Sequence, residues 1–426
     1  MKKMITRRML AGLYLLLLLP ITIQAQNQES VLMLDELIQK VLTENPELQS
    51  SYESWEASKT RISQQEALPD PTLGLNMMNL PVNSFALDQE PMTGKQITLM
   101  QMFPFPGKLN LKGKIAQSDS DISLQQYQEL QNQLVKKTKQ SYFDLFYVDQ
   151  AIATVENNQD LLSEFVEIAE TRYSVGNGLQ QDVMRAQVAL SKMIDKELKL
   201  RQQRESLQAR INALINEPAD APLGRPVDPE INNLTTDLNS LVELADTSSP
   251  LLEAWRTVVQ RSDQKVDLAL KGRYPDFSIG LAYTQRDELQ NGMKGYDFVS
   301  GMFNVRIPLY FNKKQDKKVQ EMQITRTSME YRYQDVENSI EQMLQQSLTD
   351  LEKNRRLIDL YETGILPQAE ESLESSLAGY QTDKVDFLSL LDSELTLFNL
   401  RLDYYRIVAD YHKSVADLEA LTGSEL

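Results

Sequence analysis

The sequence contains no cysteine and a single histidine, His412. Without cysteine the chain can form no disulfide and can carry no lipid on an N-terminal cysteine, so any attachment to a membrane must come from the fold itself. The sequence also lacks a glycine-rich phosphate loop and a helical histidine pair, and it therefore predicts no enzyme site and no bound cofactor. For His412 we favour a structural or exposed role, because a metal ligand would need partners that the sequence does not supply.

Long apolar runs and positive charge are also scarce. Beyond the N-terminus no segment approaches the roughly 18 apolar residues of a membrane-spanning helix, and the mean hydropathy of −0.41 is typical of a water-exposed protein. These features exclude a helical membrane protein. The net charge of −17 argues against nucleic acid and anionic lipid as partners, and it allows cationic cargo and basic partner surfaces.

The N-terminus has the order of a secretory signal. Two basic pairs precede an apolar run over residues 9–19, and Ala25 supplies a small residue directly before Gln26. We predict a signal peptide over residues 1–25 and a mature chain that begins near Gln26. The alternative is a buried N-terminal core helix, which fits poorly with basic pairs placed directly before a leucine run.

The mature chain repeats itself. Residues 174–216 align with residues 381–423 without a gap, and Leu190 then falls on Leu397. Further upstream, Pro69-Asp70 aligns with Pro275-Asp276. We predict two structural repeats, residues 26–216 and 238–426, joined by a proline-rich linker over residues 217–237.

Each repeat predicts helices of unusual length. No glycine or proline interrupts residues 114–175 or 309–363, and at about 1.5 Å per residue the first segment reaches roughly 90 Å. Apolar residues recur at a 3,4 spacing, which favours antiparallel coiled-coil packing of helix on helix. The turn over residues 174–178 reverses the chain, and we expect Gly364 and Pro367 to break or kink the long helix of the second repeat.

Four short segments alternate between apolar and polar residues. They cover residues 73–77, 97–103, 277–283 and 299–307, and each predicts a strand with one apolar face. Membrane β-barrels use about eight strands or more, so several chains must contribute to one wall if these strands face lipid. The predicted fold class is mainly α with a small β part, with four strands in each chain.

This pattern resembles the TolC family of outer-membrane efflux proteins over the whole mature chain. The resemblance depends on the duplicated element order, on the turn Tyr173-Ser174-Val175-Gly176-Asn177-Gly178 and on Leu366-Pro367-Gln368-Ala369 before Tyr380. Residues 101–109 further resemble the metal-efflux branch, whose members work with pumps of the cobalt-zinc-cadmium and copper-silver type.

The resemblance implies a homotrimer in the bacterial outer membrane. Its twelve-stranded barrel would contact outer-membrane lipid, and its twelve helices would form a tunnel across the periplasm. The turns at Gly176, Asn177 and Gly178 and over residues 379–386 lie farthest from the strands, and we call them the periplasmic tip. The tip would contact a periplasmic adaptor, which works with an inner-membrane pump of the resistance-nodulation-division class.

The resemblance also implies roles for charged residues at the tip. Asp392 aligns with one position of the family's aspartate ring at the pore constriction, while Ser389 occupies the other, and Asp383 and Asp386 are the next candidates for selectivity. A carboxylate ring would favour cations. Asp182 matches an acidic position that helps to close the tip, with Arg185 and Lys384 as its nearest basic partners. The alternative is that these residues are ordinary solvated helix carboxylates.

Several interpretations of the cargo and the function stay open. Five methionines near the first strand pair would suit Cu(I), although packing or contact with lipid is the favoured interpretation: Met77, Met78, Met92, Met100 and Met102. Heavy-metal cations, drugs and secreted protein are alternative cargoes for the same fold. A periplasmic coiled-coil protein of purely structural function is the alternative from another class, and the four strands argue against it.

Overall fold

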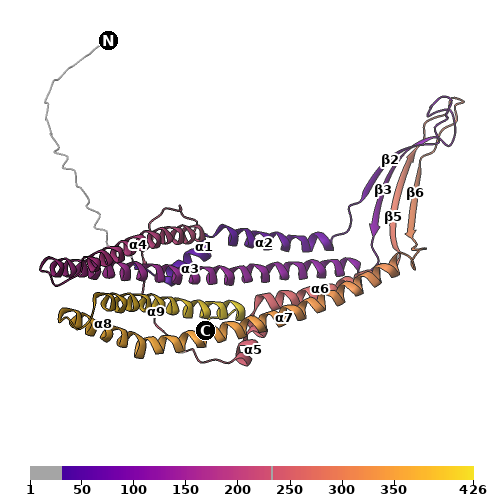
Figure 1. Cartoon of the computed structure of the whole chain (residues 1–426). Coiled ribbons are helices and arrows are strands. Elements are labelled where there is room, and N and C mark those ends of the chain that lie inside the picture. Colours follow the sequence, from indigo (N-terminus) through magenta and orange to yellow (C-terminus); the bar gives the residue numbers. More distant parts are fainter. Residues whose placement is uncertain (1–30, 232–233) are drawn as a thin grey trace, which may run out of the picture.

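The computed structural model describes residues 31–231 and 234–426 and shows an elongated molecule with a sheet at one end and helical hairpin turns at the other (Figure 1). The predicted signal peptide lies outside the described residues. The first half contains β1 (Val31–Leu32), α1 (Leu34–Glu44), α2 (Pro46–Glu66), β2 (Thr72–Met78), β3 (Gly94–Phe103), α3 (Lys108–Ser174), α4 (Gln180–Leu214) and β4 (Arg225–Pro226). The second half contains α5 (Leu238–Ser248), α6 (Pro250–Lys271), β5 (Asp276–Gln285), β6 (Phe298–Arg306), α7 (Gln315–Leu360), the π-helix η1 (Tyr361–Ile365), α8 (Leu366–Gln381) and α9 (Phe387–Thr422). The fold is mainly helical with few strands, as predicted.

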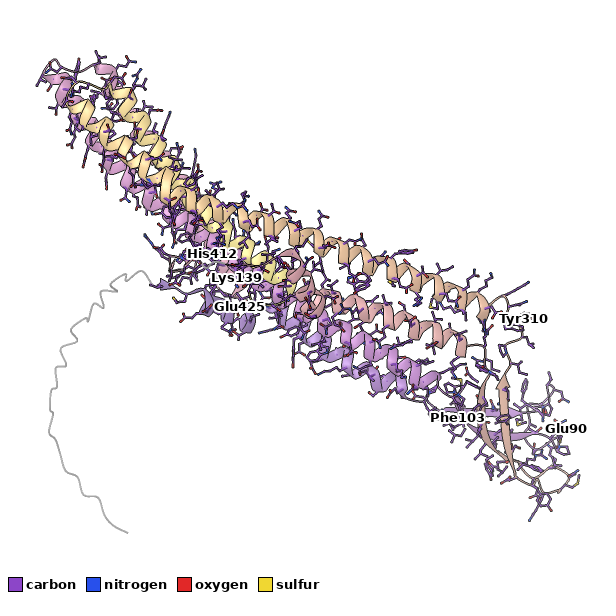
Figure 2. All side chains as sticks on the ribbon, turned by 90° about the horizontal axis from the view of Figure 1, so that it is seen from below. Glu90, Phe103, Lys139, Tyr310, His412 and Glu425 are labelled. Carbon is purple, nitrogen blue, oxygen red and sulfur yellow. The ribbon has the colours of Figure 1, made fainter. Side chains whose placement is uncertain are left out.

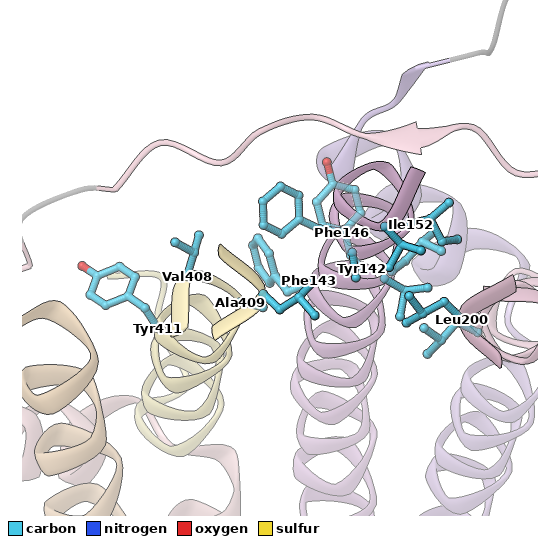
Figure 3. Close-up of a cluster of buried hydrophobic side chains, with 14 of the residues drawn as sticks. Tyr142, Phe143, Phe146, Ile152, Leu200, Val408, Ala409 and Tyr411 are labelled. Atoms are coloured by element: carbon cyan, nitrogen blue, oxygen red, sulfur yellow. The ribbon is translucent and has the colours of Figure 1, made fainter. Parts of the chain in front are cut away.

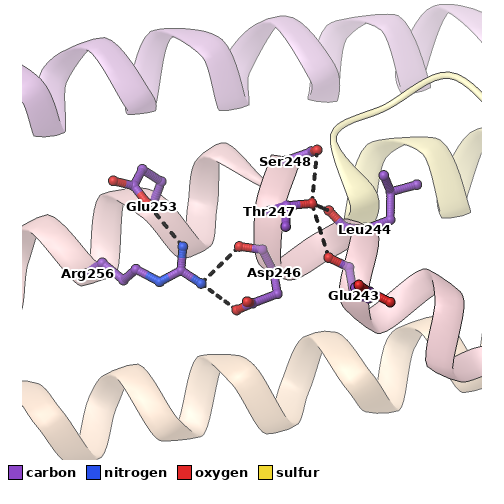
Figure 4. Close-up of polar contacts among 7 residues, drawn as sticks. All are labelled: Glu243, Leu244, Asp246, Thr247, Ser248, Glu253 and Arg256. Atoms are coloured by element: carbon purple, nitrogen blue, oxygen red, sulfur yellow. Dashed lines mark hydrogen bonds and ion pairs between the residues drawn. The ribbon is translucent and has the colours of Figure 1, made fainter.

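Local sequence signals explain where the shorter helices begin. The side chain of Asn45 accepts a hydrogen bond from the backbone N–H of Leu48 at 3.1 Å and so caps α2, whose first residue is Pro46. Asp237 caps α5 in the same way through Ser240. At the junction of α5 and α6, the Arg256 guanidinium binds Asp246 and Glu253 (Figure 4). The contact with Asp246 joins α6 to α5, whereas Glu253 lies on α6 itself.

The 67-residue helix α3 is the centre of the molecule and packs against α2, α4, α6 and α9. At about 1.5 Å per residue it is roughly 100 Å long. Most of the predicted 3,4 stripe is buried. On α3 its buried members are Leu145, Val148, Ile152, Val155, Leu162 and Ala169. Tyr173 continues the same spacing four residues after Ala169, but its side chain is exposed. Figure 3 shows Phe143 and Phe146 of α3 between residues of α9 and Leu200 of α4.

The long helix of the second half contains a π-helical turn where we expected a break or a kink. The N–H of Leu366 donates to the carbonyl of Tyr361, an i→i−5 bond, and the chain continues directly into α8. Pro367 lies in the first turn of α8, next to this shifted register, where its missing N–H costs little. The disturbance expected at Gly364 and Pro367 is therefore present, but it does not end the helix.

The four predicted strands form one antiparallel sheet in the order β2-β3-β5-β6. Each half supplies a hairpin, and the two hairpins join where β3 pairs with β5. Figure 2 shows Phe103 at the end of the sheet nearest the helices and Glu90 in the loop at its far end. A second, two-residue pairing joins β1 to β4. Strand β4 is the only regular element in the described part of residues 217–237.

Candidate functional site

One face of the sheet is apolar and exposed. The strand register places Leu73 beside Leu99 and Leu99 beside Leu281. The exposed side chains of this apolar sheet face are Leu73, Leu75 and Met77 on β2, Ile97 and Leu99 on β3, Ile279, Leu281 and Tyr283 on β5, and Val299, Phe303 and Val305 on β6. Soluble monomers rarely expose a contiguous patch of this kind.

The opposite sheet face and the sheet edges have a different character. Gly74, Thr98, Ala282 and Ser300 lie side by side on the other face, where small and polar residues prevail. The outer edges of β2 and β6 have no partner strand within the described residues, so both edges can pair with further strands. The sheet can therefore extend on both sides while one face remains apolar.

The methionines near the first strand pair differ in exposure. Met77 and Met92 are exposed, and Met100 is half-buried beside the Asn304 amide, with 4.0 Å between the amide nitrogen and the sulfur. No group of three or more His, Cys, Asp or Glu side chains suited to a metal ion occurs among residues 31–231 and 234–426.

His412 of α9 packs against α3. Its ring stacks on Phe143 with 4.6 Å between the ring centroids. Burial, with a smaller contribution from Lys139, lowers the pKa of His412 to about 4. The ring is therefore neutral at physiological pH and packs as a flat, largely apolar group.

The turn between α3 and α4 forms one half of the periplasmic tip. Gly176 has φ +81°, a conformation that side chains disfavour, and the N–H of Asn177 donates to the carbonyl of Arg172 at 2.9 Å. Gly178 leaves room for Arg172 and Tyr173, because a Cβ atom there would lie 3.0 Å from both residues. Gly176 and Asn177 are exposed and Gly178 is half-buried.

The turn between α8 and α9 forms the other half. Asp383 adopts φ +59° in place of a glycine, and the N–H of Lys384 donates to the carbonyl of Gly379 at 2.9 Å. Asp386 caps α9 by accepting the N–H of Ser389 at 2.7 Å. Hydrogen bonds from Ser389 hold the pKa of Asp386 below its usual value, and the charge of Arg185 adds to this effect. Asp383, Asp386 and Asp392 are all exposed in the single chain.

Arg172 joins the two turns, and we call its interactions the tip contact. Its guanidinium forms an ion pair with Asp383 and donates to the carbonyl of Tyr380 at 2.5 Å. It also lies 4.7 Å from the centroid of the Tyr380 ring, which packs edge-on against Phe387. The charges predicted for the tip lie within or after the turns, whereas Arg172 precedes its turn and so was missed.

The residues proposed from sequence to close the tip lie close to this contact. Asp182 is half-buried in the first turn of α4, and its charge adds to the effect of burial in raising the pKa of Tyr380. Arg185 acts on Asp386, as described above. No ion pair within residues 31–231 and 234–426 includes Asp182 or Lys384. The roles of these residues in closure, and of Asp392 in selectivity, stay predictions.

A buried polar pair lies behind the tip, between α3 and α9. The amide nitrogen of Asn158 donates to Oε1 of Glu394, and both side chains are surrounded by the apolar stripe. Burial raises the pKa of Glu394 to about 7, and the charge of Arg401 opposes this shift. The 3,4 spacing predicts Ser393 as the member of the stripe between Leu390 and Leu397, whereas the structure buries Glu394. The available signal was its position between Leu390 and Leu397, at spacings of four and three residues.

A concave, highly charged surface lies where α3, α4, α7 and α9 run side by side. The pocket there has a volume of about 690 Å³. Lys413 pairs with Asp144 at 2.9 Å and with Asp410 at 2.8 Å. On α3 the lining residues Lys137, Gln140, Ser141 and Asp144 share one helix face.

Tyr142 of α3 points away from this pocket and donates to the carbonyl of Leu32 at 3.1 Å. The β1–β4 pairing thus covers a different face of the helices.

Comparison with known proteins gives consistent matches. Residues 37–217 and 241–424 match a family model described as outer membrane efflux protein. The cobalt-zinc-cadmium resistance protein CzcC of Cupriavidus metallidurans is 22% identical over 275 residues. This match spans 62% of the chain and 62% of the length of that relative.

Solved structures show similarity over nearly the whole chain. The outer-membrane channel OprN is 14% identical, with a TM-score of 0.79 over 92% of this chain and 90% of that one. The outer membrane protein VceC of Vibrio cholerae is 17% identical, with a TM-score of 0.78 over 92% and 96%. At these identities the similarity shows that the fold is the same.

Proposed function

The chain belongs to the outer membrane efflux protein family, and from this premise we propose that it is the channel subunit of a tripartite efflux system. It is an outer-membrane protein that extends into the periplasm, and it is not an enzyme. In the proposed system it forms the passive exit duct. An inner-membrane pump of the resistance-nodulation-division class and a periplasmic adaptor deliver the cargo to it.

The exposed apolar sheet face is the observation that carries this proposal. Strands of 7 to 10 residues approach the roughly 9–11 residues that a tilted strand needs to cross a bilayer. Four strands cannot close a barrel, and both edges of the sheet are free to pair. Three chains would close a twelve-stranded barrel whose apolar face meets lipid. The helices below it would then form the wall of a periplasmic tunnel.

The same arrangement argues against a purely structural coiled-coil protein. Such a rod would gain nothing from a four-stranded sheet with an exposed apolar face, because exposed apolar surface favours aggregation. The predicted chain organisation belongs to the proposal: a signal peptide over residues 1–25, repeats over residues 26–216 and 238–426, and a linker over residues 217–237. The exposed turn at Gly176, Asn177 and Gly178 is the proposed contact with the adaptor.

Heavy-metal cations are the proposed cargo. The similarity to a protein named for cobalt, zinc and cadmium resistance supports this choice, and so do the net charge of −17 and the exposed carboxylates of Asp383, Asp386 and Asp392. A negatively charged duct concentrates cations near its walls. Drug efflux and type I protein secretion are the alternative functions of the same duct.

Two experiments test the architecture and the cargo separately. The mass of the detergent-solubilised mature protein should be that of a trimer, and a stable monomer would refute the shared barrel. A deletion strain should then be grown on graded copper, silver, zinc, cobalt, cadmium and drugs, with the intact gene restored as the control. Sensitivity to metals alone supports the proposed cargo, whereas sensitivity to drugs alone assigns the duct to drug efflux.

A further inference from the structure

The buried polar pair is an exception within an otherwise apolar contact. Asn158 on α3 is 5% exposed and Glu394 on α9 is 3% exposed. Along α3 the neighbouring buried residues are Val155 and Leu162, and along α9 Glu394 lies between Leu390 and Leu397. A carboxyl group in such surroundings is costly unless all its polar atoms find partners.

As an ionised group, Glu394 would leave this requirement unmet. Its Oε1 accepts the Asn158 amide N–H, but its Oε2 has no hydrogen-bond partner and is shielded from solvent. The amide oxygen of Asn158 is likewise buried without a partner. Both unpaired atoms are acceptors, so no rotation of the two side chains can satisfy them with each other. One added proton, carried on Oε2, would provide the missing donor.

We propose that Glu394 is protonated in this structure and forms a two-hydrogen-bond acid–amide pair with Asn158, and that loss of this proton loosens α9 from α3 behind the tip. In the protonated pair the amide N–H donates to Oε1, and the acid O–H donates to the amide oxygen. Both buried acceptors are then satisfied by a single proton taken from solvent.

The charged groups on the surrounding elements do not neutralise an ionised Glu394. Arg401 on α9 acts on it electrostatically, but its guanidinium is already paired with Glu370 of α8 at 2.8 Å. Lys196 of α4 extends over the Phe398 ring, 4.7 Å from its centroid. On α8 the nearest polar contact with this part of α9 joins the hydroxyls of Ser376 and Ser393 at 2.9 Å.

The direction of the pH effect follows from these surroundings. Burial raises the pKa of Glu394 from its ordinary value of 4.5 to about 7. The stabilisation that the protonated pair contributes is therefore complete below the ordinary value and is lost as the pH rises through about 7. Above that pH a buried carboxylate faces an unsatisfied amide oxygen, and water can reach it only if the two helices separate.

The position of the pair links this event to the tip. Asn158 precedes Arg172 by fourteen residues on α3, a distance of about 21 Å along a helix. The buried polar pair and the tip contact therefore hold the α8–α9 hairpin to α3 at two successive levels. If the hairpin lines the channel, a consequence that rests on the proposed function, rising pH favours the open tip.

Infrared spectroscopy of the full-length protein in detergent tests the protonation state directly. A protonated carboxylic acid has a carbonyl band separate from that of a carboxylate, and we expect one buried acid band to disappear with a midpoint near pH 7. Glu394→Gln should lack this band. Glu164→Gln, which removes an exposed carboxyl of α3, should keep it. A wild-type protein with no such band at about pH 6 would overturn the proposal.

A second variant separates a proton-sharing pair from mere burial. Asn158→Leu removes both the amide oxygen that accepts the acid O–H and the N–H that donates to Oε1, so the carbonyl band of the acid should shift to the frequency of an acid without hydrogen bonds. A band of unchanged frequency would show a carboxyl that is merely buried and would contradict the pairing. This measurement needs no channel and stands even if the proposed function fails.

Single-channel recording then tests the effect on the tip. Wild-type conductance should rise between about pH 6 and pH 8, whereas Glu394→Gln, whose amide can keep two hydrogen bonds to Asn158, should stay low and independent of pH. If wild-type protein forms no channel, the proposed function fails. If it forms a channel whose conductance ignores pH while the acid band titrates, the proposed loosening of the tip is wrong.

Discussion

Replacing Arg172 by methionine should loosen the α8–α9 turn without unfolding the helices. Methionine keeps much of the apolar stem but removes the charged donor. Arg172 makes three contacts: a hydrogen bond to the carbonyl of Tyr380, a cation–π contact with the Tyr380 ring and an ion pair with Asp383. Each of them crosses from one hairpin turn to the other, so the local effect should be confined to the tip.

The magnitude can be worked from these contacts. A hydrogen bond from a charged donor contributes about 1.5–3 kcal/mol, and an exposed cation–π contact about 0.5–1 kcal/mol. The Asp383 side chain is 72% exposed, so its ion pair adds no more than about 1 kcal/mol. Together the contacts contribute about 2–5 kcal/mol, and their loss raises the population of the locally open turn by about 30-fold to 5000-fold.

Hydrogen exchange on the full-length protein measures this population. The N–H groups of Asp383, Lys384 and Val385 donate to carbonyls of Gly379 and Tyr380, so their exchange should accelerate by the same factor. Arg61→Met is the matched control, because Arg61 is an exposed residue of α2 and forms no ion pair within the described residues. Equal exchange in wild-type protein and both variants would show that the turn is held by packing of Tyr380 and Phe387 instead.

Two further predictions concern the charges at the tip. In a planar bilayer, Asp392→Asn should weaken both the preference of the channel for cations and its inhibition by multivalent cations, because it removes a carboxylate from each chain at the proposed constriction. Unchanged selectivity would shift the assignment to Asp383 or Asp386. The double variant Asp182→Ala with Lys384→Ala should raise single-channel conductance and sensitise cells to large antibiotics. It removes the charges that would pair when three chains close the tip, and pairs of about 0–1 kcal/mol each can act together there. Conductance that stays at the closed level in an intact trimer would assign closure to helix packing.

Most of the fold could be predicted because its signals are local. The 3,4 spacing identified the long helices, and alternation identified all four strands of the sheet. The position of the disturbance at Gly364 and Pro367 could also be predicted, since both residue types weaken a helix. That the disturbance is a π-helical turn could not be predicted, because such a turn depends on how the neighbouring helices hold the chain on either side.

The contacts at and behind the tip could not be predicted in the same way. Arg172 meets Asp383 across more than two hundred residues, and nothing beside Arg172 in the sequence points to that partner. The same holds for Asn158 and Glu394. Glu394 looks like any acidic residue of a solvated helix until its apolar neighbours at i−4 and i+3 are considered together with the facing helix.

The π-helical turn η1 gives the molecule a broken symmetry. Residues 108–174 and 315–381 are the corresponding long segments of the two halves, equal in length, yet only the second changes its hydrogen-bond register, at Tyr361–Ile365. The corresponding part of α3 remains regular and carries Asn158. A trimer of such chains would have nearly sixfold geometry beside the sheet and only threefold geometry beyond η1. The three α8–α9 hairpins, one from each chain, could then move together while the three α3–α4 hairpins stay in place, and this movement would widen the tip.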